Sequence, residues 1–215
     1  TPLYSSAASD VYKRQIVASL YGRNSLADLV RESASRIFIP LTVGGGIRSC
    51  ADIHALLRAG ADKVCINTAA MGRPEFITEA ARSFGSQCIV IAVETIRQVD
   101  GSWKAFTDNG REHTGLDAYD WARRAVDLGA GELILTSVDR EGGRKGFDLE
   151  FIARLARTVG VPVVAHGGAG SIADVAAVAA LGVDGVAVAS ILHYKQVAVG
   201  DLKTGLAAAG VEVRA

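Results

Sequence analysis

Short apolar segments alternate along the chain with segments whose apolar residues recur at helical spacing. The apolar segments end at glycines or polar residues, which is typical of buried strands, and the stretches between them are typical of amphipathic helices. Near-continuous apolar strands between helices indicate a parallel sheet that helices cover. The predicted strands are residues 16–19 (a fragment), 39–43, 63–68, 88–94, 132–139, 161–166 and 185–190.

The number of strand–helix units favours a closed barrel over an open sheet. Amphipathic patterns are clearest at residues 50–60, 117–129 and 171–182. This many units favour an α/β fold of the TIM type, a (β/α)₈ barrel. Between Glu94 and Thr114, alternating residues flank a turn pair in QVDGSWKAFTDNG, which predicts an inserted β-hairpin.

Two long segments of the chain repeat one another. Residues 41–70 align without a gap with residues 163–192, and the alignment runs through strand, glycine loop, helix and next strand. Such a repeat predicts a barrel built from duplicated half-barrels. The identical pairs are Gly45/Gly167, Gly46/Gly168, Ser49/Ser171, Ala51/Ala173, Asp52/Asp174, Ala55/Ala177, Gly60/Gly182, Asp62/Asp184 and Val64/Val186.

The repeated glycine loops are candidate phosphate sites. In TVGGGIRS and again in HGGAG, glycines lie between a strand and a helix, where backbone N–H groups can approach an anion closely. The alternative is a pair of tight strand-to-helix turns that bind no ligand. Because duplication would place the two loops across one barrel mouth, the repeat favours a substrate with two phosphates.

Three side chains at predicted strand ends between these loops are candidate acid–base groups. Glu94 ends CIVIAVE, Asp139 ends ELILTSVD and His166 ends VPVVAH. A carboxylate after a run of apolar residues is poorly explained as a solvated surface charge and suits proton transfer. Alternatively, Glu94 bonds to loop backbone, Asp139 caps the glycine-rich turn REGGRKG, and His166 is structural.

Composition narrows the class of partner. The 215 residues include 23 Lys and Arg against 23 Asp and Glu, so no basic surplus indicates nucleic acid. No apolar run approaches the roughly 20 residues of a membrane span. A small soluble substrate is therefore expected.

The cysteines, Cys50, Cys65 and Cys88, lack CxxC spacing, which favours buried thiols in a reducing cytoplasm over a metal site.

Residues 1–15 differ from the rest of the chain. TPLYSSAASDVYKRQ is polar, rich in serine and without strand or helix periodicity. Part of it is similar to translated adapter sequence, so we expect a foreign, disordered segment that supplies no first strand–helix unit. Residues 16–215 then form the barrel domain.

Residues 16–215 resemble the cyclase subunit of imidazole glycerol phosphate synthase, a lyase of histidine biosynthesis. The resemblance is carried by IPLTVGGGIRS, GADKVCINTAA, FGSQCIV, TGLDAYDWARRAVDLGAGELILTSVDREG and HGGAG followed by VAVASILHY. Each string alone is shared with the sister isomerase of the pathway, and together they indicate the cyclase. The resemblance implies a duplicated barrel that takes a bisphosphorylated aminoimidazole carboxamide nucleotide. With ammonia delivered from a glutaminase subunit, it would form imidazole glycerol phosphate and an aminoimidazole carboxamide ribotide.

The resemblance also implies roles for individual residues. Glu94 would be catalytic, and Asp62 and Lys63 fall where the family meets its glutaminase, so we expect a heterodimer. No cofactor or metal is implied. The residues expected to bind substrate and its phosphates are Gly45, Gly46, Asn67 and Thr68 in the first half, Gly167, Gly168, Ala189 and Ser190 in the second, and Thr136, Asp139 and Gly142 between them.

The chain departs from the family's pattern at several positions. The family places catalytic aspartates on its first and fifth strands; Glu94 replaces the second of these, and the first strand and most of the second are missing. His166 stands where the family has a serine, and Glu141 where an aspartate is usual. We therefore expect the 215-residue chain itself to be inactive. A paralogue that aminates a sugar in surface-polysaccharide synthesis, the sister aldose–ketose isomerase and a non-catalytic phosphate-binding partner remain alternatives.

Overall fold

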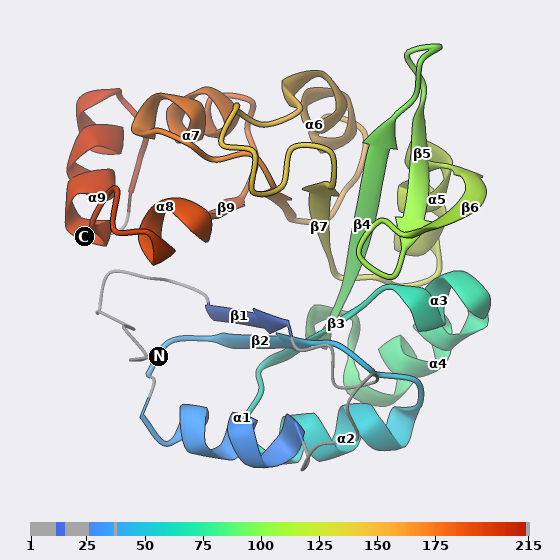
Figure 1. Cartoon of the computed structure of the whole chain (residues 1–215). Helices are drawn as coiled ribbons and strands as arrows, with labels where there is room; N and C mark the ends of the chain where they lie inside the picture. The colour runs from blue at the N-terminus through green and yellow to red at the C-terminus, as the bar shows by residue number, and fades with distance from the viewer. Residues whose placement is uncertain (1–11, 16–25, 37, 214–215) are drawn as a thin grey trace.

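A parallel sheet forms the centre of the computed structural model, which describes residues 12–15, 26–36 and 38–213 (Figure 1). Every neighbouring pair of strands along the main path of this sheet is parallel. In their order across the sheet, these strands are β1 (Tyr12–Gln15), β2 (Leu41–Gly44), β3 (Lys63–Ile66), β4 (Ile89–Arg97), β7 (Glu132–Ser137), β8 (Val163–His166) and β9 (Gly185–Ala187).

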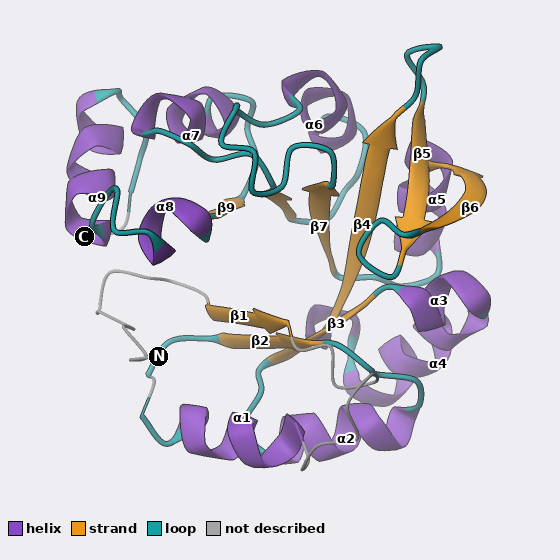
Figure 2. Ribbon diagram, viewed as in Figure 1, coloured by secondary structure: helices purple, strands orange, loops and turns teal. Residues whose placement is uncertain are grey.

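Helices connect most of the parallel strands and lie outside them, as predicted for an α/β fold of the TIM type (Figure 2). Within the described residues, β1 and β9 are the two ends of the sheet and do not pair with each other, so the predicted closure into a barrel is not observed. The helices α1 and α2 lie along one side of the molecule, and α6, α7 and α9 along the opposite side (Figure 1). Their bounds are α1 (Leu26–Ala34), α2 (Cys50–Arg58), α3 (Thr68–Gly72), α4 (Glu75–Phe84), the 3₁₀ helix η2 (Ser86–Cys88), α5 (Ala118–Asp127), α6 (Leu149–Ala156), α7 (Ile172–Ala179), α8 (Ser190–His193) and α9 (Val199–Ala208).

The strands are apolar on both faces, which explains their near-continuous hydrophobic pattern. On β4, Ile89, Ile91 and Val93 belong to the large core cluster shared with the helices, whereas Val90 and Ala92 belong to a smaller cluster on the inner face of the sheet. A strand buried on both faces tolerates few polar residues along its length. A polar residue on such a strand therefore requires a specific partner.

The inserted hairpin is confirmed, but its first strand is β4 itself. Continuing to Arg97, β4 pairs antiparallel with β5 (Trp103–Thr107), which in turn pairs antiparallel with β6 (Glu112–Asp117). The strand predicted at residues 88–94 ends at Glu94, where the run of apolar residues stops. The pairing partner β5 lets the strand continue beyond that point.

The two repeated segments form the same helix caps. Ser49 precedes α2 and accepts a hydrogen bond from the Asp52 N–H, and Ser171 precedes α7 and accepts one from the Asp174 N–H. Each aspartate accepts a bond from its serine hydroxyl in return, at 2.9 Å in both halves. Burial alone would raise the pKa of Asp52, but hydrogen bonds from the main chain of Arg48 and from Ser49 lower it.

A second aspartate pair repeats a longer-range contact. Asp62, just before β3, accepts a hydrogen bond from the Leu41 N–H at 2.7 Å, and Asp184, just before β9, accepts one from the Val163 N–H at 2.9 Å. In return, the N–H groups of both aspartates donate to the carbonyls of the same two residues at 2.9 Å. Equivalent bonds in both segments confirm the predicted duplication.

The structure corrects one expectation about the beginning of the chain. The strand predicted at residues 16–19 lies outside the described residues. Instead, Tyr12–Gln15 pair in parallel with Leu41–Gly44, so the expectation that residues 1–15 supply no strand is wrong for these four residues. The free edge of β2 offers main-chain N–H and C=O groups that pair with any extended segment whatever its side chains, so a polar composition did not exclude a strand. The foreign origin of residues 1–15 stays a prediction.

Among the described helices, none combines the length and apolar character needed to cross a membrane.

The aspartate bonds predict matched losses of stability. Asp62→Ala and Asp184→Ala should each lower the free energy of unfolding by about 1–2 kcal/mol, because each leaves a strand N–H without its carboxylate partner. Urea denaturation of both variants measures this. The control is Asp127→Ala, an exposed position at the end of α5, which should stay within about 0.5 kcal/mol of the unsubstituted chain. Losses that differ widely between the two aspartates would contradict their structural equivalence.

Candidate active site

Side chains on the inner face of the sheet follow from alternation along each strand. The inner apolar layer consists of Cys65, Val90, Ala92 and Ile134, with Val164 packed against it. Successive side chains of a strand point to opposite faces, so the next inner position lies two residues further along. At the carboxyl ends of the strands, these next inner positions are Asn67 after β3, Glu94 on β4, Thr136 on β7 and His166 on β8.

Strand register brings three of these side chains into one row. Glu94 is paired with Thr136 across β4 and β7, and Thr136 with His166 across β7 and β8. The Thr136 hydroxyl lies 3.2 Å from His166 Nδ1. The structure therefore brings together a carboxylate, a hydroxyl and an imidazole that are far apart in the sequence.

Glu94 is buried and held by main chain. Its side chain is 5% exposed, and its Oε2 accepts a hydrogen bond from the Gly110 N–H at 3.0 Å. The alternative prediction, that Glu94 bonds to the backbone of a loop, is thus confirmed. The carboxylate nevertheless lies on the inner face of the sheet. Gly110 is not among the site residues predicted from the sequence. It lies in the predicted hairpin, in the turn signal DNG, but that signal does not indicate a contact with Glu94.

Both glycine loops lie at the same edge of the sheet, because each follows the carboxyl end of a strand in one parallel array. Gly45 and Gly46 have φ of 114° and 70°, and Gly167 and Gly168 have φ of 89° and 119°. A Cβ on Gly168 would lie 2.2 Å from the Gly146 carbonyl oxygen. Close packing against the backbone therefore explains why residue 168 is glycine. A turn that binds no ligand would require glycine there as well.

The short helices after β3 and β9 begin in matching ways. Asn67 precedes α3 with φ −128° and ψ −85°, and Ala189 precedes α8 with φ −133° and ψ −66°. Thr68 and Ser190 are the first residues of these helices. The Asn67 side-chain amide also donates to the Phe106 carbonyl of β5 at 3.3 Å. The duplication thus extends to the second pair of predicted phosphate residues.

The loop after β7 carries the remaining predicted substrate residues, Asp139 and Gly142. Both are exposed, and Gly142 has a φ of 72°. The turn is closed by the N–H groups of Arg140 and Glu141, which donate to the Ser137 carbonyl. Within the described part of the chain, no hydrogen bond joins the Asp139 carboxylate to this turn. The main-chain bonds, and not Asp139, therefore cap the glycine-rich turn.

The two residues predicted to face a partner lie at the opposite edge of the sheet. Lys63 begins β3, and its Nζ lies 2.5 Å from Oε2 of Glu132, which begins β7. Asp62 makes the bond to the Leu41 N–H that Asp184 repeats with Val163 in the second half. Since the repeat keeps this bond, Asp62 has a structural role that needs no partner.

A cavity of about 380 Å³ lies next to the second glycine loop, because Gly146, one of its lining residues, donates its N–H to the Gly168 carbonyl. It lies between the end of β4, the loop before α6, and the helices α6 and α7. None of the predicted catalytic or phosphate-binding residues lines it. The inner-face row, rather than this cavity, is the better candidate for chemistry because it collects a buried carboxylate and an imidazole. The lining residues are Arg97, Arg140, Lys145, Gly146, Phe147, Asp148, Leu149, Glu150, Asp174 and Ala177.

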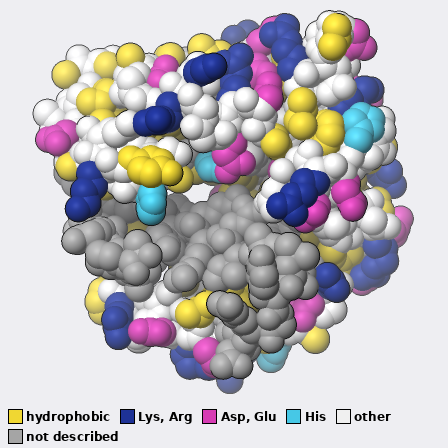
Figure 3. Space-filling model, viewed as in Figure 1, with side chains coloured by type: hydrophobic (Ala, Val, Ile, Leu, Met, Phe, Trp, Pro, Cys, Tyr) yellow, Lys and Arg dark blue, Asp and Glu magenta, His cyan; other side chains and the backbone are white. Residues whose placement is uncertain are grey.

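The surface carries charges of both signs. Over the described part of the face in Figure 3, Lys and Arg side chains are interspersed with Asp and Glu, in keeping with 23 residues of each sign in the sequence. Nowhere in the described residues do three or more His, Cys, Asp or Glu side chains gather in a group that could hold a metal ion.

Comparison with known proteins gives the family. The family model described as "Histidine biosynthesis protein" matches residues 3–198. The imidazole glycerol phosphate synthase subunit HisF of Legionella pneumophila is 53% identical over 171 residues, which is 80% of this chain and 81% of that protein. Proteins of the same name from Mycobacteroides abscessus and Mycobacterium tuberculosis are 48% and 46% identical over 205 residues, 93% of this chain and 80% and 77% of theirs.

The packing of the second glycine loop predicts a large cost for one methyl group. Gly168→Ala should lower the free energy of unfolding by about 2–4 kcal/mol, because the new Cβ meets main chain and φ is strongly positive. Gly182→Ala, at φ +81° with open space around it, should cost only about 1 kcal/mol. Urea denaturation distinguishes the two. Equal losses would mean that the loop relaxes and that close packing does not dictate this glycine.

Proposed function

The chain belongs to the histidine biosynthesis family, as a cyclase subunit of imidazole glycerol phosphate synthase, and we propose that Glu94 is its acid–base carboxylate. The observation that carries the proposal is the burial of Glu94 on the inner face, in register with Thr136 and between two equivalent glycine loops. In barrels of this kind, the carboxyl ends of the strands form the active face.

The two glycine loops would hold the two phosphates of the substrate. Each loop leads into the first turn of a helix, where the helix dipole and main-chain N–H groups favour an anion. Equivalent caps and equivalent starts of α3 and α8 support two sites of one design. The first site would use Gly45, Gly46, Asn67 and Thr68, the second Gly167, Gly168, Ala189 and Ser190, with Thr136, Asp139 and Gly142 along the substrate between them.

Glu94 would transfer protons at the middle of the bound substrate. Addition of ammonia and closure of an imidazole ring both move protons between nitrogen and oxygen atoms, and a fixed carboxylate can accept a proton and return it. The Gly110 N–H donates to Oε2 of this carboxylate and holds it on the inner face. His166, bonded to Thr136 in the same row, would face the same part of the substrate.

A glutaminase would dock at the opposite edge of the sheet, around Asp62 and Lys63. The relatives are named as subunits, which implies a complex with another chain. Lys63 and Glu132 form an ion pair at that edge, and the apolar layer of Cys65, Val90 and Ala92 separates it from Glu94. An apolar layer admits neutral ammonia far more readily than the charged ammonium ion, which suits delivery from one edge to the other.

Substitution of Glu94 tests the proposed chemistry. Glu94→Gln keeps the shape of the side chain but cannot take up a proton, so turnover should fall on the order of 10²-fold or more. Glu94→Asp keeps the carboxylate and should retain more activity than Glu94→Gln. The assay follows ammonia-dependent conversion of the bisphosphorylated nucleotide, in a chain whose first 15 residues are replaced by the amino-terminal segment of the Legionella pneumophila relative.

The control for this assay is Glu112→Gln, an exposed glutamate at the start of β6, which should leave turnover unchanged. Full turnover in Glu94→Gln would remove this residue from the mechanism.

A further inference from the structure

The turn between β5 and β6 folds back onto the end of the inner row. Residue Phe106 of β5 lies opposite Glu94 in the antiparallel ladder. A few residues later, the Gly110 N–H donates to Glu94 Oε2 at 3.0 Å. An insertion outside the repeating strand–helix units therefore contacts the candidate catalytic carboxylate directly.

Glycine at position 110 is required by both conformation and space. Its φ is +81°, and a Cβ there would lie 2.3 Å from Cγ1 of Val138, in the loop after β7. The preceding residues, Asp108 and Asn109, also have positive φ, of 52° and 58°. Since both the left-handed conformation and the approach to Val138 disfavour a side chain, glycine is the residue that best brings this N–H to Glu94.

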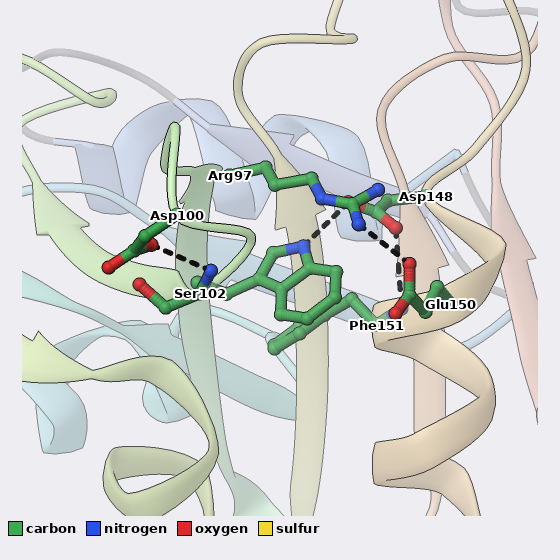
Figure 4. Close-up of polar contacts among 7 residues, drawn as sticks. Arg97, Asp100, Ser102, Asp148, Glu150 and Phe151 are labelled. Carbon is green, nitrogen blue, oxygen red and sulfur yellow. Dashed lines mark hydrogen bonds and ion pairs between the residues drawn. The ribbon is translucent and has the colours of Figure 1, made fainter.

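The hairpin that carries this turn is anchored to α6. Trp103, the first residue of β5, donates from its indole N–H to Asp148 Oδ2 at 2.7 Å, and Asp148 is only 3% exposed. Arg97 lies over the Trp103 ring, 4.8 Å from its centroid, and pairs with Glu150 at 2.9 Å. These contacts of Arg97, Asp148 and Glu150 are drawn in Figure 4. The buried bond from Trp103 to Asp148 holds the base of the hairpin in one position, whereas the Arg97–Glu150 pair is largely exposed and adds little.

A second contact ties the hairpin to the first predicted phosphate site. The Asn67 side-chain amide donates to the Phe106 carbonyl at 3.3 Å. Phe106 is thus linked to Asn67 by its carbonyl and lies beside Glu94 in the ladder. The hairpin bridges β3 and β4 at the barrel mouth.

We infer that Gly110 is a positioning residue for Glu94, with its main-chain N–H fixing one oxygen of the carboxylate. A main-chain donor neither titrates nor changes rotamer, so the carboxylate keeps one orientation throughout a proton-transfer cycle. The hydrogen bond also favours the ionised form, which is the form that accepts a proton. A role of Gly110 in turnover rests on the proposed function of Glu94. The hydrogen bond between Gly110 and Glu94 does not depend on that proposal.

The first test follows the titration of Glu94 in the 215-residue chain. In ¹³C NMR, the resonance lost in Glu94→Gln identifies the carboxyl carbon of Glu94. In Gly110→Ala, the titration midpoint should rise by about one pH unit, the shift expected when a hydrogen bond to a charged group is lost. The titratable groups on neighbouring elements are unchanged in this variant: Asp108 and Arg111 in the turn, Asp139, Arg140 and Glu141 after β7, and His166 on β8.

Two further variants separate positioning from backbone strain. Gly101→Ala introduces a methyl at φ +84° in the other turn of the hairpin, where nothing lies within 4 Å, so it should leave the midpoint unchanged. Gly110→Ala combined with Val138→Ala removes the methyl groups that the new Cβ would meet, and should return the midpoint toward its original value. Thermal melts of all variants check that each one folds.

Turnover provides the second test, in the assay used for Glu94. Gly110→Ala should lower kcat about tenfold with KM changed less than twofold, and the double variant should recover most of the loss. Loss of turnover in Glu94→Gln together with an unmoved midpoint in Gly110→Ala would overturn this inference and leave the proposed function standing. A raised midpoint together with full turnover in Glu94→Gln would sink the proposed function and, with it, the catalytic role of this bond.

Discussion

Parallel pairing of β4 with β7 and of β7 with β8 determines which side chains meet at the barrel mouth. The register places Glu94 beside Thr136 and Thr136 beside His166. Because alternation along a strand is strict, a shift of one residue in either pair would turn the whole row toward the helices. The apolar clusters on the two faces of β4 prevent such a shift, since Val90 and Ala92 fit the inner layer and Ile91 and Val93 fit the helix layer.

Duplication supplies the second constraint on the molecule. The same serine–aspartate cap and the same aspartate bond to a strand N–H occur in both halves, so the two glycine loops meet their helices in the same way. Under the proposed function, these equivalent loops at one edge of the sheet would present two anion sites of one design to one substrate. The hairpin after β4 breaks the repeat, and it is the part of the fold that reaches Glu94.

The two edges of the sheet differ in chemistry, and the apolar layer between them keeps them apart. One edge carries Asn67, Glu94, Thr136 and His166, while the other carries the ion pair of Lys63 and Glu132. The chain belongs to the histidine biosynthesis family, and its relatives are named as subunits of imidazole glycerol phosphate synthase. This membership supports the proposal of one edge for chemistry and one for a partner. In the described structure, Asp62 has a structural role at the edge that carries Lys63 and Glu132, because its carboxylate accepts a hydrogen bond from the Leu41 N–H.

The sequence by itself determined the strand–helix alternation, the duplication and the strand on which Glu94 lies, because these depend on periodicity and local glycine chemistry. It did not determine where the strands end: β4 runs on to Arg97 since β5 pairs with it. Nor did it exclude pairing of Tyr12–Gln15, since a free strand edge accepts any extended backbone. Only the tertiary structure decided that the Gly110 N–H meets Glu94 and that Thr136 meets His166, because these bonds join residues whose separation along the chain carries no local signal.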